Sequence, residues 1–238
     1  MSMSEFIKDV IVDPHDVDYN GIARASSIMK YIQSAAEAQL TEGGMSYEEL
    51  KAKKRAFILS RIRLEIYEPI RECRPLRAVS YPSESRGYSF FRCYRIESEG
   101  ATIARAISVW ALVDTETRGL VRVNDFELGI TPLPPINMEI GRVKLPDTLI
   151  DVGGYGVHYG DVDRNMHMNN TKYPDMYSNF LPLKSRRIKA ITVNYQNEAK
   201  IGDKLRVMRA EADGLYYFRT VRSDGLVNSE AEIELCDL

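Results

Sequence analysis

Cysteine is scarce in this sequence, and the missing cysteine patterns exclude several kinds of protein. Three cysteines, Cys73, Cys93 and Cys236, are spread over 238 residues with no C-x-x-C pair and no zinc-site spacing. An odd number of distant cysteines argues against a secreted domain held together by disulfides. We therefore expect a reduced, cytoplasmic protein.

Long apolar runs and an excess of one charge are also absent. No stretch approaches the ~20 apolar residues of a membrane helix, so we expect no membrane insertion. The start, MSMSEFIKDVIV, has no basic segment followed by a long apolar one, so we expect no signal peptide. The net charge of −2 gives no electrostatic argument for a nucleic acid partner. We expect neither a metal nor another cofactor.

A short pattern occurs twice in the chain. Residues 16–21 are DVDYNG, and residues 161–165 are DVDRN. The first copy resembles the start of a calcium-binding loop, but its twelfth position, which must supply a bidentate carboxylate, is Ser27. The second copy has Lys172 at that position. We therefore expect both copies to be turns formed by Asp and Asn side chains.

Each copy precedes a segment with helical periodicity. The segment ASSIMKYIQSAAEAQLTEGG, residues 25–44, has apolar residues at i, i+3 and i+4 spacing and ends in two glycines. The segment NNTKYPDMYSNFLP, residues 169–182, has a similar apolar stripe between Asn169 or Asn170 as a cap and Pro182 as a stop. The sequence therefore predicts one helix after each turn.

Strand-like segments follow each predicted helix and complete two similar halves. The pair YSFFRCYRIESEG and LYYFRTVRSDG align well, because each combines two aromatic residues and an arginine with an acidic-Gly turn. One helix with an antiparallel meander predicts an α+β unit, a sheet wrapped around its central helix. We expect an N-terminal domain at 1–124, a proline-rich linker at 125–147 and a C-terminal domain at 148–238.

The two copies differ in one titratable side chain. His167 in the second copy corresponds to Ile22 in the first, whereas His15 and His158 precede the copies and are expected to be loop residues. If the turn is extended, alternate residues face one side, and Asp163, Asn165 and His167 converge on one site. Such a set suits acyl transfer or hydrolysis. On spacing alone, a turn with capping side chains and a structural histidine explains the pattern equally well.

The second copy resembles a known family motif. DVDRNMHMNNTKY is similar to the D-x-D-x-N-x-H-x-N-N-x-K-Y motif of acyl-acyl carrier protein thioesterases, double hot-dog proteins that release free fatty acids from acyl carrier protein. LSRIRLEIYEP and ARAISVWALVDTETRGLVRV in the first half also resemble family strands, and the likeness runs from about residue 5 to the C-terminus. It implies two tandem hot-dog domains of the bacterial type.

The resemblance assigns candidate site residues. It places catalysis on Asp163, Asn165 and His167, and adds Glu198 on the next strand. The alternative interpretation of Glu198 is an exposed carboxylate at the end of a strand. It implies hydrolysis with Asp163 as general base or nucleophile, and with Asn165 and helix-start amides polarising the carbonyl. The other expected substrate contacts are Asn169 and Asn170, and an acyl-chain tunnel near Ile28, Met29 and Ile32, side chains that could equally be core.

One departure from the family limits the mechanism. Plant members carry a cysteine after the glutamate, and this chain has Ala199 there. The three cysteines lie far from the motif in sequence, so a Cys-His mechanism through that position is excluded.

The implied partner is acyl carrier protein with its fatty acyl chain. Because that protein is acidic, the basic stretches 51–55 (KAKKR) and 184–189 (KSRRIK) are candidate docking sites, although such stretches are commonly just solvated surface. An acyl-coenzyme A thioesterase and a non-catalytic acyl-binding module remain alternative functions. We expect either a monomeric pseudo-dimer or a homodimer.

Overall fold

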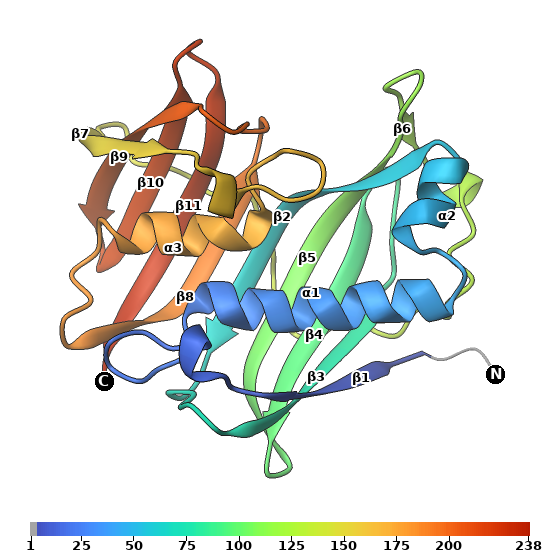
Figure 1. Ribbon diagram of the computed structural model, residues 1–238, viewed down its shortest axis with the longest axis horizontal. Helices are drawn as coiled ribbons and strands as arrows, with labels where there is room; N and C mark the ends of the chain where they lie inside the picture. Colours follow the sequence, from blue (N-terminus) through green and yellow to red (C-terminus); the bar gives the residue numbers. More distant parts are fainter. Residues whose placement is uncertain (1–3) are drawn as a thin grey trace.

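The computed structural model describes residues 4–238, which form one 11-stranded antiparallel sheet with the helices on one of its faces (Figure 1). The strand order is β1-β3-β4-β5-β2-β8-β11-β10-β9-β7, and the short β6 pairs with β5. The first five strands in this order come from the N-terminal half and the last five from the C-terminal half. The two half-sheets therefore meet where β2 pairs with β8.

The two halves share a series of one strand, one helix and four strands, to which the N-terminal half adds the short α2 and β6. The N-terminal half consists of β1 (Phe6–Ile11), α1 (Ala25–Glu42), α2 (Tyr47–Ala52), β2 (Arg55–Ile66), β3 (Pro75–Pro82), β4 (Phe90–Ser98), β5 (Ala101–Asp114) and β6 (Leu120–Val121). The C-terminal half consists of β7 (Ile150–Gly156), α3 (Tyr173–Ser178), β8 (Arg186–Tyr195), β9 (Lys204–Ala212), β10 (Leu215–Arg222) and β11 (Val227–Asp237). The predicted α+β fold of two tandem hot-dog units is confirmed.

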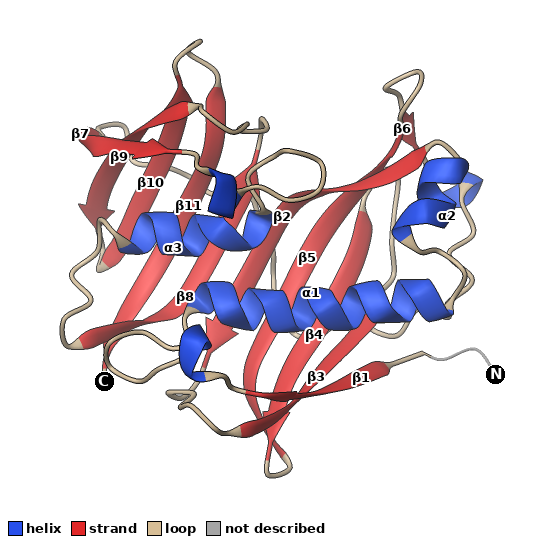
Figure 2. Ribbon diagram, in the orientation of Figure 1, coloured by secondary structure: helices blue, strands red, loops and turns tan. Residues whose placement is uncertain are grey.

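The helices cover one face of the sheet side by side (Figure 2). The apolar face of α1, including Ile28 and Ile32, is buried against the N-terminal strands. In the C-terminal half, the ring of Tyr177 on α3 lies 4.9 Å from the ring of Phe218 on β10. The two helices meet where the Ser26 hydroxyl donates to Asp175 Oδ1 at 2.5 Å. None of the helices within residues 4–238 is long and apolar enough to cross a membrane.

Two helical features differ from the prediction. The short helix α2 was not predicted. Its start is a capping box formed by Ser46 and Glu49, and the pattern S-x-x-E in the sequence indicates such a box. The second predicted helix is shorter than residues 169–182, because a 3₁₀ turn at Asn170–Lys172 precedes α3 and α3 ends at Ser178. Beyond it, i to i−3 hydrogen bonds tighten the chain, such as Asn179 N to Met176 O.

The proline-rich segment crosses the sheet face opposite the helices. Residues 126–149 contain no helix or strand, and their apolar side chains pack on a small cluster of the N-terminal half-sheet. The segment contributes Leu133, Ile136, Met138 and Ile140, and the sheet contributes Val79, Tyr81, Cys93 and Ile107. We keep the domain boundaries at residues 124 and 148 as a proposal.

A buried cation lies between α1 and the N-terminal half-sheet. Arg92 on β4 is 6% exposed, and its Nη1 donates to Gln39 Oε1 on α1 at 2.5 Å and to Ser80 Oγ at 2.8 Å. Burial lowers the pKa of Arg92, because the guanidinium loses its hydration and no carboxylate within residues 4–238 pairs with it. The Gln39 amide is therefore an important partner of this charge.

We expect Gln39→Leu to lower the free energy of unfolding by about 2 kcal/mol, because a hydrogen bond to a buried charge is lost. Gln33→Leu in the same helix is the matched control. Gln33 Nε2 is buried and has no hydrogen-bond partner within residues 4–238, so its removal should leave the stability unchanged or raised. Urea unfolding measures both variants, and equal losses of stability in the two would contradict the assignment.

Candidate active site

The second D-x-D-x-N copy forms a tight hairpin turn. Asp163 N donates to His167 O at 2.9 Å, and Met166 N donates to Asp163 O at 2.9 Å. Met166 adopts a left-handed backbone with φ of 64°, which closes the turn. The turn is therefore not extended, and the expectation that alternate residues share one face is wrong in its geometry.

The hairpin nevertheless brings two of the predicted residues together. Val162 pairs with Met168, so Asp163 and His167 are directly opposite each other and project from the same face. Asp163 Oδ1 accepts a hydrogen bond from Asn165 N at 2.8 Å, which is the turn-forming role expected of this aspartate. Within residues 4–238 this is the only hydrogen bond to its carboxylate, so Oδ2 stays available.

The imidazole of His167 is paired with the predicted glutamate. His167 Nε2 lies 3.1 Å from Glu198 Oε2, and the two side chains are 29% and 54% exposed. Glu198 follows the end of β8 at Tyr195, so it lies in the β8–β9 connection. The resemblance implied a position on a strand, and that detail is wrong. The connection is held next to the hairpin by the bridge between His167 and Lys200, and Arg222 Nη1 donates to Glu198 O at 2.7 Å.

Asn165 at the tip of the turn contacts the other half of the molecule. The Tyr47 hydroxyl of α2 donates to Asn165 Oδ1 at 3.0 Å. The Arg164 guanidinium lies 3.9 Å from the centroid of the Tyr47 ring. The sequence analysis missed both Tyr47 and Arg164. The capping box that starts α2 was the one local signal, and it does not reveal which turn the helix faces.

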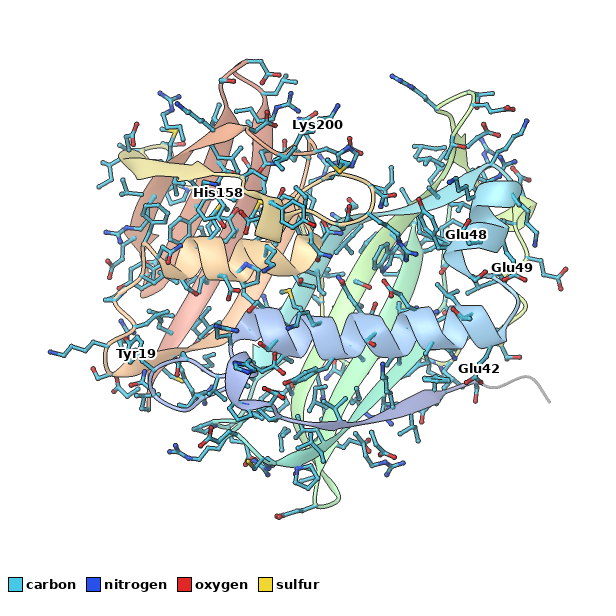
Figure 3. All side chains as sticks on the ribbon, viewed as in Figure 1. Tyr19, Glu42, Glu48, Glu49, His158 and Lys200 are labelled. Atoms are coloured by element: carbon cyan, nitrogen blue, oxygen red, sulfur yellow. The ribbon has the colours of Figure 1, made fainter. Side chains whose placement is uncertain are left out.

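The first copy has the same backbone turn, but it lacks the counterparts of His167 and Glu198. Asp18 N donates to Ile22 O at 2.8 Å, Asp18 Oδ1 accepts from Asn20 N, and Gly21 takes the left-handed position of Met166. Ile22 bridges to Arg71 as His167 bridges to Lys200. By the same register, Pro69 corresponds to Glu198. The first copy is thus the same turn without the acid–imidazole pair. The two copies lie far apart, because Tyr19 of the first copy is distant from Lys200, which pairs with His167 of the second (Figure 3).

The two asparagines that follow His167 have structural contacts. Asn169 Oδ1 accepts from Thr171 N at 2.9 Å and caps the 3₁₀ turn, while Asn170 O accepts from the Tyr195 hydroxyl. The amides of Met168 and Asn169 donate to Ala199 O and Asp161 O. These two amides are therefore used by the fold, and their role in polarising a carbonyl finds no support. Substrate contacts of Asn169 and Asn170 remain predictions.

The residues expected along the acyl chain lie in the main core. Ile28, Met29 and Ile32 are at most 1% exposed and pack with both half-sheets in one cluster. Their role in a tunnel remains a prediction. Ala199 is buried beside the hairpin, and all three cysteines are free, with Cys93 buried on the opposite face of the sheet.

The arrangement suits water-mediated hydrolysis. The carboxylate of Asp163, with one unused oxygen, lies on the hairpin opposite His167, and His167 pairs with a second carboxylate, that of Glu198. Such a pair can accept a proton from water and deliver it to a leaving group. A side-chain amide at the tip of the same turn can donate to a developing oxyanion.

Family profiles match both halves of the chain. The profile of the acyl-ACP thioesterase N-terminal domain matches residues 4–128, and that of the C-terminal domain matches residues 148–235. A chloroplastic palmitoyl-acyl carrier protein thioesterase of Arabidopsis thaliana is 22% identical over 213 residues, covering 81% of this chain and 52% of that protein. A chloroplastic dodecanoyl-[acyl-carrier-protein] hydrolase of Cinnamomum camphora is 25% identical over 127 residues, covering 48% and 33%. The chain thus spans between a third and about half of the length of these curated relatives.

Solved structures share the whole fold. An acyl-ACP thioesterase from Bacteroides thetaiotaomicron superposes with a TM-score of 0.90 at 19% identity, covering 98% of both chains. The 12:0-ACP thioesterase from Umbellularia californica superposes with a TM-score of 0.86 at 18% identity, covering 100% of this chain and 99% of that one. At these identities the superpositions establish the fold alone. The two profile matches, which together span most of the chain, establish that this protein belongs to the acyl-ACP thioesterase family.

Proposed function

We propose that the protein hydrolyses the thioester of a fatty acyl chain on acyl carrier protein and thereby ends fatty acid synthesis. The observation that carries the proposal is the His167–Glu198 pair at 3.1 Å opposite Asp163, present in one copy of the turn and replaced by Ile22 and Pro69 in the other. A turn that served only the fold would not need this difference. Family membership and the acyl-ACP activities in the relatives' names support the same reaction.

The proposed chemistry uses Asp163 as general base. Its unused Oδ2 takes a proton from water, and the water oxygen attacks the thioester carbonyl. Asn165 Nδ2 donates to the oxyanion as the carbon–oxygen bond forms. His167, oriented by Glu198, delivers a proton to the sulfur as the carbon–sulfur bond breaks. The products are a free fatty acid and the carrier thiol. The three free cysteines fit a reducing compartment, and we propose a cytoplasmic location.

Acyl carrier protein is the proposed partner, and α2 leads to its proposed docking stretch. In the stretch 184–189, Arg186 and Lys189 pair with Asp237 and Glu234. In the stretch 51–55, Lys54 and Arg55 likewise pair with Glu116 and Asp114, while Lys51 and Lys53 form no ion pair within residues 4–238. This second stretch continues α2, which touches the catalytic turn through Tyr47. We therefore favour residues 51–55 as the surface for the acidic carrier.

We expect Asp163→Asn and His167→Ala each to lower kcat by at least about 100-fold, because each removes a proton-transfer group. Asn at position 163 keeps an oxygen that can accept from Asn165 N, so the turn should survive. Asp18→Asn makes the same change in the first copy and should leave kcat unchanged. Turnover of an acyl carrier protein thioester measures all three, and rates like the wild type in the first two would refute the assignment.

The role of Asp163 as base predicts where oxygen from water goes. In a single turnover in ¹⁸O-labelled water, we expect the label in the fatty acid and none in the Asp163 carboxylate. A nucleophilic aspartate would form an anhydride with the acyl group, and attack of water on the aspartyl carbonyl of that anhydride would place label in the Asp163 carboxylate and an aspartate oxygen in the fatty acid. Mass spectrometry of the peptide that contains Asp163 distinguishes the two routes. Label in that peptide would show direct attack.

The docking surface predicts a carrier-specific defect. We expect Lys51→Glu together with Lys53→Glu to lower kcat/KM on an acyl carrier protein thioester by about tenfold, because attraction becomes repulsion. The same variant should act normally on a small acyl thioester, and added salt should shrink the difference. Lys184→Glu is the control. Equal wild-type rates on acyl-coenzyme A and on the carrier thioester would favour the acyl-coenzyme A alternative, and tight acyl binding without turnover would favour a binding module.

A further inference from the structure

The N-terminal half contributes a side chain to the turn that holds the candidate catalytic residues. Tyr47 is the first residue of α2, and its hydroxyl donates to Asn165 Oδ1 at 3.0 Å. Asp163, Asn165, His167 and Glu198 all belong to the C-terminal half. Tyr47 is therefore a contact through which the other half reaches this site.

Two neighbouring residues of the turn contact Tyr47 at once. Asn165 accepts from its hydroxyl, and the Arg164 guanidinium stacks 3.9 Å from the centroid of its ring. A guanidinium at this distance from an aromatic face is attracted by the ring quadrupole. The ring is thus held on its face and at its hydroxyl end, which restricts its orientation.

Local structure fixes where Tyr47 begins. The Ser46 hydroxyl accepts from Glu49 N at 3.3 Å, and Ser46 N donates to Glu49 Oε2 at 2.8 Å, so the capping box sets the first turn of α2. Met45 and Leu50, on either side, are buried and anchor the helix to the N-terminal half. The backbone position of Tyr47 is therefore set by the N-terminal half, while its ring contacts the turn of the other half.

In the first copy of the turn, the corresponding asparagine side chain is bound at its opposite end, the NH2 group. Asn20 corresponds to Asn165, and its Nδ2 donates to Leu183 O at 3.5 Å. In the first copy the donor end of the amide is thus bound by a backbone carbonyl. In the second copy the acceptor end is bound by Tyr47, which leaves the donor end for another group.

We propose that Tyr47 is a positioning residue that orients the Asn165 side chain for catalysis. By holding Oδ1, the tyrosine hydroxyl turns Nδ2 toward the carbonyl oxygen of the substrate, where a donor stabilises the developing oxyanion. The inference rests on the proposed thioester hydrolysis. It extends that proposal, because it makes the active site a joint product of both hot-dog halves.

Tyr47→Phe tests the hydroxyl while keeping the ring on which Arg164 stacks. We expect kcat on an acyl carrier protein thioester to fall about tenfold, with KM within about twofold, because a misoriented amide weakens binding of the transition state more than that of the substrate. Tyr19→Phe is the matched control, since Tyr19 lies in the first copy of the turn and is 75% exposed. Its kcat should equal that of the wild type.

A double-mutant cycle shows whether Tyr47 acts through Asn165. In an Asn165→Ala background, Tyr47→Phe should change kcat by less than about twofold, because the group that it orients is gone. A tenfold loss in both backgrounds would overturn the proposal, and so would an unchanged kcat in Tyr47→Phe alone.

The contact can also be tested without turnover. The side-chain amide proton resonance that disappears in Asn165→Ala belongs to Asn165. We expect it to shift in Tyr47→Phe and to stay in place in Tyr19→Phe. If it does not shift, the contact is absent and the proposal fails, whatever the activity. If it shifts but the wild type hydrolyses no acyl thioester, the proposed function fails while the contact stands.

Discussion

The pairing of β2 with β8 is the interaction on which the rest of this structure depends. Five residue pairs, from Arg61 with Asn194 to Glu65 with Ala190, join the two half-sheets into one. On the helix side of this seam Ile62, Leu64, Ile191 and Val193 are at most 1% exposed. The pairing satisfies the backbone groups of two edges that would otherwise be open to other chains. It also fixes the distance between the helices of the two halves.

The two copies of the turn differ in the side chains that other segments bring to them. A half that forms the fold needs only the Asx hydrogen bond and a left-handed closing residue, and both copies keep these. Chemistry requires more groups than one hairpin can supply. The second copy gains Glu198 from the β8–β9 connection and Tyr47 from α2 across the seam. The first copy, with Ile22 and Pro69, is left to stabilise the fold.

Much of the fold follows from local patterns. The helix α1 and the strands β4 and β10 lie where periodicity and turn residues predict them, because each buries one regular face. The length of α3 was overestimated, because 3₁₀ turns at both ends replace helical ones. The helix α2 was missed although Ser46 and Glu49 mark its start. Six residues are too few for an apolar period to stand out.

The sequence by itself determined the turn residues, the repeat and the family motif, because these depend on neighbours along the chain. It named Asp163, Asn165 and His167 and explained their proximity by an extended segment, and the family resemblance added Glu198. Only the tertiary structure showed that a hairpin places Asp163 opposite His167, and that a separate connection carries Glu198. Tyr47 is 118 residues from Asn165, so no local pattern could join them. Contacts between distant segments depend on how the sheets pair, and that is decided when the whole chain packs.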